Sequence, residues 1–264
     1  MTEQTYTYNH NSFNLNEAGN YTLLIQANAK TFDYAITHNK TLMSLGTNCA
    51  VDELTSSDKL MAEYKQTVIT VPAKAFTLVP VNLFDAARLA DMARVLDVKE
   101  NEKVLAQVLD EDNYVIYKSD EQLVRNTSSL DTKNIKFAPD GWLKAIEQSG
   151  PSNSYLHLNI NGTYVEFAYF KGNKLRFYNK FEATSPEELL YFTLMVSNEL
   201  ELKQQQTTLV LSGSINPGDA HYKNLAEYFF NVRLNSQQPL ELPADMDIPA
   251  HQLLYLSALY LCAL

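Results

Sequence analysis

One run of the chain, Tyr155 to Ile215, constrains the fold most, because it orders three strands, a helix and a fourth strand. Asn161-Gly162 between the first two strands is a strong hairpin signal. Ser185 before Pro186 predicts a capped helix after the third strand. The four strands are expected, in chain order, at Tyr155–Ile160, Thr163–Phe170, Lys174–Phe181 and Thr207–Ile215.

The first part of the chain shows the same order of elements between Tyr21 and Leu96. Short runs rich in β-branched and aromatic residues predict strands. These strands are expected at Tyr21–Ala27, Thr31–Thr37, Thr41–Gly46, Thr67–Val71 and Phe76–Val79, with helices at Asp52–Tyr64 and Leu83–Leu96. The matching run in the second part is Tyr155 to Phe230, and the repeat concerns element order, not individual residues.

Three antiparallel strands followed by a helix and a parallel fourth strand form the ribonuclease H-like unit. Two such units form the fold shared by actin, sugar kinases and Hsp70. We therefore expect an α/β protein with a duplicated ribonuclease H-like (actin-like ATPase) fold, two lobes each with a βββαβα core. The alternative is an unrelated α+β protein whose element order matches by chance.

The expected domains are an irregular lead-in (1–20), a first lobe (21–150) and a second lobe (151–264). Gly150-Pro151 is the best internal boundary signal in the chain. Two strands around Asp110-Glu111-Asp112-Asn113 predict a hairpin, and we place it in an inserted subdomain of the first lobe at about 101–139. The acidic turn lacks the spacing of a dedicated calcium loop.

Composition and charge exclude several function classes. The chain has 264 residues, of which 45% are hydrophobic, and a net charge of -10, so a broad nucleic-acid surface is disfavoured. The apolar run Leu253–Leu264 is too short to cross a bilayer and predicts a core helix, so no membrane insertion is expected. No secretory signal is visible, and Cys49 and Cys262 lie far apart, which favours a reduced, cytoplasmic protein.

Phe76-Thr77-Leu78-Val79-Pro80 followed by Leu83-Phe84 resembles a signature of an uncharacterised Bacteroidetes family of unknown function, grouped with the actin-like ATPase superfamily. The resemblance covers most of the chain from about Tyr21 and implies a two-lobed actin-like fold without an established activity. The layout is also similar to PilM-type pilus-assembly proteins. Further matching features are Asn179-Lys180-Phe181, Leu190-Tyr191-Phe192, Leu209-Val210-Leu211-Ser212-Gly213, His251 with Leu253-Leu254, and Leu261-Cys262.

An actin-like ATPase needs glycine in the first hairpin of each lobe, an Asp there for Mg²⁺ or water, and a glycine-rich turn for adenosine. The first hairpin, Gln26-Ala27-Asn28-Ala29, has neither glycine nor Asp. The second, Asn159 to Thr163, keeps Gly162 but offers neutral amides. The adenosine turn, Leu211 to Ser214, has one glycine. We therefore expect no catalytic residues and no cofactor.

The remaining candidates for binding ATP and Mg²⁺ are few. They are Asn161 and Gly162 in the second hairpin, and Ser212 and Gly213 in the adenosine turn. A plain hairpin turn at Asn161-Gly162 is the simpler interpretation. No histidine stands at metal-ligand spacing from another histidine or a cysteine, so no metal site is predicted.

The leading functional hypothesis is a non-catalytic actin-like protein, a pseudo-ATPase of a bacterial cytoplasm acting as an interaction or scaffold module. A protein partner or self-association would suit the exposed members of its sixteen tyrosines. The alternative is an ATP-dependent enzyme of the actin and sugar-kinase superfamily with atypical site residues, drawing carboxylates such as Asp33 or Glu166. A third hypothesis is a binding module for a peptide or envelope component.

Overall fold

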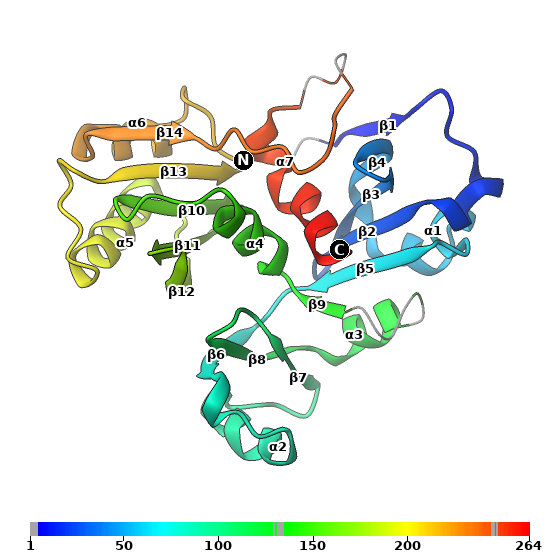
Figure 1. Ribbon diagram of the computed structural model, residues 1–264, viewed down its shortest axis with the longest axis horizontal. Coiled ribbons are helices and arrows are strands. Elements are labelled where there is room, and N and C mark those ends of the chain that lie inside the picture. Colours follow the sequence, from blue (N-terminus) through cyan, green and yellow to red (C-terminus); the bar gives the residue numbers. More distant parts are fainter. Residues whose placement is uncertain (1–4, 129, 131–134, 244–245, 247) are drawn as a thin grey trace. The chain divides into compact units, whose positions relative to one another are not determined.

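The chain forms two compact units, seen in a computed structural model that describes residues 5–128, 130, 135–243, 246 and 248–264 (Figure 1). The N-terminal unit holds the described residues of 4–141, 240–243 and 259–264. The C-terminal unit holds those of 142–239 and 244–258. The chain passes from the first to the second near the start of helix α4 (Asp140–Gln148).

The C-terminal unit is built on a five-stranded sheet of order β12-β11-β10-β13-β14. β10, β11 and β12 pair antiparallel, while β13 pairs parallel with both β10 and β14. Helices α5 and α6 pack on one face of the sheet, against apolar residues such as Leu156 and Leu158. The elements are β10 (Tyr155–Asn161), β11 (Tyr164–Lys171), β12 (Lys174–Glu182), α5 (Pro186–Glu199), β13 (Thr208–Gly213), α6 (Ala220–Tyr228), β14 (Asn231–Leu234) and α7 (Ala250–Ser257).

The N-terminal unit repeats this strand order in its sheet, β1-β4-β3-β2-β5-β9, with β1 added at one edge. β2, β3 and β4 pair antiparallel, and β5 pairs parallel with β2 and β9. The duplicated order that the sequence predicts is therefore present in both units. The strands are β1 (Thr7–Asn9), β2 (Thr22–Ala27), β3 (Thr31–His38), β4 (Thr41–Ala50), β5 (Gln66–Val71) and β9 (Ile135–Phe137).

The inserted subdomain is larger than predicted. Because of it, the last helix of the repeated unit in the first lobe lies later in the chain than predicted. Its sheet, of order β6-β8-β7, recruits the strand that we expected to follow the fourth strand of the lobe. The helix equivalent to α6 is consequently α3 (Glu121–Ser128), after the insertion, and not the segment 83–96. The reason is the non-local pairing of β6 with β8. The strands are β6 (Ala75–Pro80), β7 (Glu102–Val108) and β8 (Asn113–Asp120).

Two predicted helices are broken into short pieces. In the first, Ser56 donates its hydroxyl to the Asp52 carbonyl, and the chain restarts as a single turn. In the second, the Asp85 side chain accepts the Ala87 N–H and starts a new turn. Such side-chain bonds compete with a continuous helix. The pieces are η2 (Val51–Thr55), α1 (Asp58–Met61), η3 (Val81–Leu83), η4 (Ala86–Arg88), α2 (Leu89–Met92) and η5 (Ala93–Leu96).

The N-terminal lead-in is also more regular than predicted. Besides β1 it contains a 3-10 helix, η1 (Leu15–Asn20), which begins where the Asn14 side chain accepts the Asn16 N–H. The chain ends with another, η6 (Ala258–Cys262), directly after α7, so the predicted C-terminal helix changes type at Ala258. In the part of the chain that the structure describes, no helix combines the length and apolarity needed to cross a bilayer.

The first hairpin turn of the C-terminal unit differs from the prediction by one residue. Asn161 pairs with Tyr164 across the ladder, so the central residues are Gly162 and Thr163, with the positive φ of 59° at Gly162. A single glycine at the first central position is typical of a type II′ turn. At the next turn, Gly172 and Asn173 both have positive φ, which is typical of type I′.

Candidate functional site

Asn159 lies at the centre of the sheet in the C-terminal unit. It is opposite Glu166 in the antiparallel pair β10–β11 and opposite Ser212 in the parallel pair β10–β13. Because side chains alternate along a strand, Asn159 and His157 lie on the face opposite Leu158. This polar face is the one that α7 covers, since Tyr255 of α7 bonds to Glu166. Asn159, the first residue of the second predicted hairpin, is therefore buried between the sheet and α7.

Glu166 is a buried carboxylate with three donors. Its Oε1 accepts hydrogen bonds from Tyr178 Oη at 2.8 Å and Tyr255 Oη at 3.0 Å. Its Oε2 accepts from Asn159 Nδ2 at 2.8 Å. Burial raises the pKa of both tyrosines far above their ordinary value, and the nearby Glu166 charge adds to this. Both phenols therefore stay protonated and act as donors to the carboxylate.

Ser212 and Gly213 lie beside Asn159, because β13 pairs parallel with β10. Gly213 has φ of 85°, and a Cβ there would collide with the Ile160 carbonyl oxygen and lie 2.9 Å from Asn159 Oδ1. Glycine is thus required for the close approach of β13 to the end of β10. Among the described residues, the buried atoms Asn159 Oδ1 and Ser212 Oγ have no hydrogen-bond partner. The same is true of both ring nitrogens of His157.

The other two candidates lie apart from this group. Asn161 and Gly162 are exposed at the hairpin tip, and nothing stands within 4 Å of a Cβ placed on Gly162. The tip therefore fits the plain-turn interpretation. Sequence reasoning missed Tyr178 and Tyr255, and it named Glu166 only as one carboxylate that an enzyme would draw on. Glu166 had a visible signal, since it is a charged residue within the apolar run Val165 to Phe170.

The N-terminal unit has an equivalent group. Gln26 of β2 lies opposite Asp33 of β3 and opposite Thr70 of β5. Asp33 Oδ1 accepts the backbone N–H of Asn48 at 2.7 Å, and Asn48 has a positive φ of 55°. Thr70 is fully buried and donates its hydroxyl to the Ile25 carbonyl at 3.4 Å.

The two groups occupy the same register, and we call them the polar triples. The N-terminal triple is Gln26–Asp33–Thr70, and the C-terminal triple is Asn159–Glu166–Ser212. Each holds an amide on the first strand, a carboxylate on the second and a hydroxyl on the fourth. The repeat thus extends to residue chemistry, which the sequence alone does not reveal.

The carboxylates of the two polar triples are engaged by hydrogen-bond donors of their own units. Mg²⁺ is usually held by carboxylates with several waters, whereas the Glu166 carboxylate is surrounded by three uncharged donors. The Asp33 carboxylate holds a backbone N–H of its own sheet. Within the described residues, no group of three or more His, Cys, Asp or Glu side chains could hold a metal ion. The acidic turn folds on itself, since Asp110 Oδ1 accepts the backbone N–H groups of Asp112 and Asn113.

The duplicated sheets define a protein of the actin-like ATPase fold, and comparison with solved structures supports this. A Bacteroides thetaiotaomicron protein with an actin-like ATPase fold and unknown function aligns with a TM-score of 0.79 at 19% identity, over 95% of this chain and 99% of that one. The chain belongs to a family of proteins of unknown function, DUF3822, whose model matches residues 10–232. A search of curated proteins gave no match.

Two further structures share the fold at lower identity. The PilM–PilN type IV pilus biogenesis complex aligns with a TM-score of 0.61 at 11% identity, over 91% of this chain and 96% of that one. The ethanolamine utilization protein EutJ from Carboxydothermus hydrogenoformans aligns with a TM-score of 0.50 at 8% identity, over 91% and 89%. At these identities the likeness concerns the fold alone. The expected family, actin-like fold and PilM-like layout are confirmed.

Proposed function

We propose that this chain is a non-catalytic member of the actin-like ATPase fold and serves as a cytoplasmic interaction or scaffold module. The observation that carries the proposal is the engagement of Glu166, the carboxylate beside the second hairpin. It accepts three hydrogen bonds from uncharged groups of its own unit. A carboxylate held in this way would have to break several buried bonds to bind a metal.

Two observations support an interaction role. PilM, a protein of the same fold, occurs in the PilM–PilN type IV pilus biogenesis complex. In the C-terminal unit of this chain, aromatic side chains of the kind enriched at protein interfaces are exposed. They are Tyr164, Tyr191, Tyr228 and Phe230.

Thermal denaturation with ATP or ADP, each with and without Mg²⁺, tests the proposal. We expect no change in melting temperature and no release of phosphate from ATP. A rise of several degrees would overturn the absence of nucleotide binding, and sustained phosphate release would favour the enzyme hypothesis.

The Ser212→Ala variant is the matched control for a positive result. It removes one hydroxyl beside Asn159 and leaves the exposed hairpin tip unchanged. Loss of the nucleotide response in this variant would place binding at the C-terminal triple, whereas an unchanged response would place it elsewhere.

A further inference from the structure

One face of the inserted sheet β6-β8-β7 is covered by the chain's own residues 81–97, which we call the strap. Figure 1 shows it as the group of short turns around α2. The opposite face of the sheet contacts the unit through Phe137, whose ring lies 5.5 Å from Phe76 and 5.1 Å from Tyr117. Gln107 adds two hydrogen bonds there, accepting the Phe137 N–H at 2.7 Å and donating to Asp140 at 2.9 Å. The sheet is therefore attached to its unit without the strap.

Alternate residues of the central strand β8 hold the strap at its start and near its end. The Tyr114 ring stacks on Phe84 at 3.8 Å with an interplanar angle of 6°. Ile116 is buried in one cluster with Ala93 and Leu96, near the end of the strap. Lys118 Nζ donates to the carbonyl oxygen of Asp97 at 2.9 Å. The strap is thus fixed to one strand at its start and near its end.

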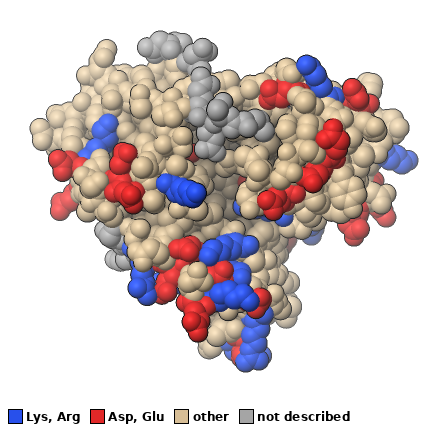
Figure 2. All heavy atoms as spheres, turned by 180° about the vertical axis from the view of Figure 1, so that it is seen from behind, with Lys and Arg blue, Asp and Glu red and all other residues tan. Residues whose placement is uncertain are grey.

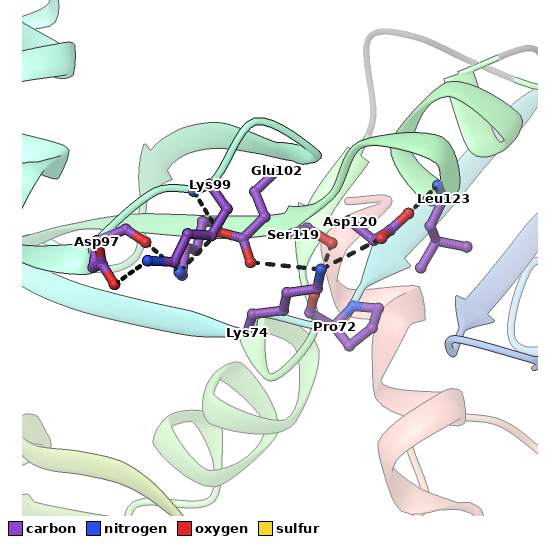
Figure 3. Close-up of polar contacts among 9 residues, drawn as sticks. Pro72, Lys74, Asp97, Lys99, Glu102, Ser119, Asp120 and Leu123 are labelled. Carbon is purple, nitrogen blue, oxygen red and sulfur yellow. Dashed lines mark hydrogen bonds and ion pairs between the residues drawn. The ribbon is translucent and has the colours of Figure 1, made fainter.

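The Lys118 contact belongs to a network of charges. Figure 3 shows its labelled members Lys74, Asp97, Lys99 and Glu102. Glu102 accepts from Lys118 Nζ at 2.8 Å and from the Lys99 N–H at 2.9 Å, and Lys74 Nζ lies 3.5 Å away. These bonds lower the pKa of Glu102 to about 2, with the Lys118 hydrogen bond as the largest cause. Asp97, the last residue of the strap, has a left-handed φ of 49°, and its carbonyl accepts the hydrogen bond from Lys118. Figure 2 shows acidic and basic side chains mixed over this inserted sheet, at the bottom of the view.

Between its two ends the strap packs loosely. Its helical pieces are three or four residues long, too short to be stable on their own. Only Ala93 and Leu96 of the strap are buried in the apolar cluster beneath it, while Phe84, Leu89 and Met92 are partly exposed. Segments with few buried contacts open at low free-energy cost.

We infer that the strap is a displaceable cover over an apolar docking face, and that its displacement admits an amphipathic segment of a partner protein. The strap itself shows which chemistry the face accepts: aromatic and aliphatic side chains on short helical turns. Displacement exposes the Ile116 face of the sheet, while Phe137 and Gln107 keep the sheet in place. The inference rests on the proposed interaction role and names the surface that would carry it.

Hydrogen exchange of the full chain, measured by mass spectrometry, tests the opening. Lys118→Met keeps an unbranched apolar stem but removes the donor to Asp97, so strap amides should exchange at least tenfold faster. Hydrogen exchange in the two larger sheets, β1-β4-β3-β2-β5-β9 and β12-β11-β10-β13-β14, should be unaffected. The matched control is Lys103→Met on the exposed edge of β7, which should exchange like wild type. Unchanged exchange in the strap would overturn the inference.

Phe84→Ala removes the anchor at the other end and provides a second route if Lys118→Met unfolds the whole chain. It should again accelerate exchange in the strap alone. If it accelerates exchange across the N-terminal unit equally, the strap is an inseparable part of the fold and the inference is wrong.

A synthetic peptide of residues 81–97 tests docking directly. We expect saturable binding to the Lys118→Met protein, at least tenfold tighter than to wild type, in which the strap occupies the face. The control peptide carries Leu89→Asp and Met92→Asp and should not bind. Equal binding to both proteins would overturn the docking face, whatever the nucleotide experiments show about the proposed function.

Discussion

The two polar triples share a register but use their carboxylates differently. Glu166 lies under α7 and accepts from two phenols and an amide. Asp33 is half-buried and accepts a backbone N–H from the neighbouring strand β4. One carboxylate joins a helix to three strands, and the other fixes a left-handed residue within one sheet. The same arrangement of strands in both units therefore does not determine the role of its central carboxylate. The elements that pack against that carboxylate determine its role.

Removing each carboxylate should separate the two triples most clearly. Glu166→Ala leaves two phenols and an amide without their buried acceptor, so we expect a loss of about 3–5 kcal/mol in the free energy of unfolding. Asp33→Ala leaves one N–H in a half-buried position and should cost about 1–2 kcal/mol. Chemical denaturation measures both. Equal costs would mean that the triples are energetically alike.

Gly213 marks a second difference, because Val71 follows Thr70 where Gly213 follows Ser212. Gly213→Ala places a Cβ against the Ile160 carbonyl at positive φ, and should cost about 2–4 kcal/mol. The control is Gly172→Ala, which has φ of 59° but open space around it and should cost about 1–2 kcal/mol. Melting temperatures of the two variants give the ranking, and the reverse order would rule out the close approach.

The pH dependence of stability should also differ, because His157 occupies the register position of Leu24. Burial lowers the pKa of His157 to about 3, with a smaller effect from the Arg233 charge. Below about pH 6.5, His157 therefore binds a proton in the unfolded chain but not in the folded chain. The free energy of unfolding consequently falls as pH decreases from about 6.5 to 3.

His157→Leu installs the residue of the other unit and should remove this dependence. The slope lost is up to about 1.4 kcal/mol per pH unit, or about 1.6 kcal/mol between pH 6.5 and 5. Urea denaturation at these two pH values measures it. An unchanged slope in the variant would assign the pH dependence to other groups.

The smallest expected effect concerns the phenol from α7. Tyr255→Phe removes one hydrogen bond to Glu166 Oε1 and should cost about 1 kcal/mol. Tyr178 donates to the same oxygen, so Tyr178→Phe and Tyr255→Phe should not be additive in a double-mutant cycle. Additive costs would show that the two phenols act independently.

Strands β2 to β5 of one sheet and β10 to β13 of the other could be predicted from the sequence, because alternation and turn residues are local signals, whereas the edge strand β1 was missed. Ser185 shows the same for a helix start, since its hydroxyl accepts the Glu188 N–H as expected. Glu188, three residues after Ser185, is placed to complete a capping box with the Ser185 N–H, but its carboxylate accepts the Thr184 N–H instead. Local chemistry thus gives element positions, with small errors at the ends.

The strap and the site show where local signals fail. Leu83 to Leu96 has the apolar spacing of a helix, yet the Asp85 side chain ends one turn and begins another. The insertion could not be delimited, because the pairing of β6 with β8 links residues distant in sequence. Tyr255 reaches Glu166 across 89 positions of the chain, and no periodicity carries such a contact.

The Gln107 side chain bears on how this protein could be shortened by deleting the insertion. Its amide oxygen accepts the N–H of Phe137 in β9, the last strand at that edge of the main sheet. Excising the insertion would remove this side chain and leave an open hydrogen-bonding edge, which favours strand-to-strand aggregation. The insertion therefore also protects the edge strand β9 from pairing with another molecule. A shortened chain would need another group to cover that edge in order to stay monodisperse.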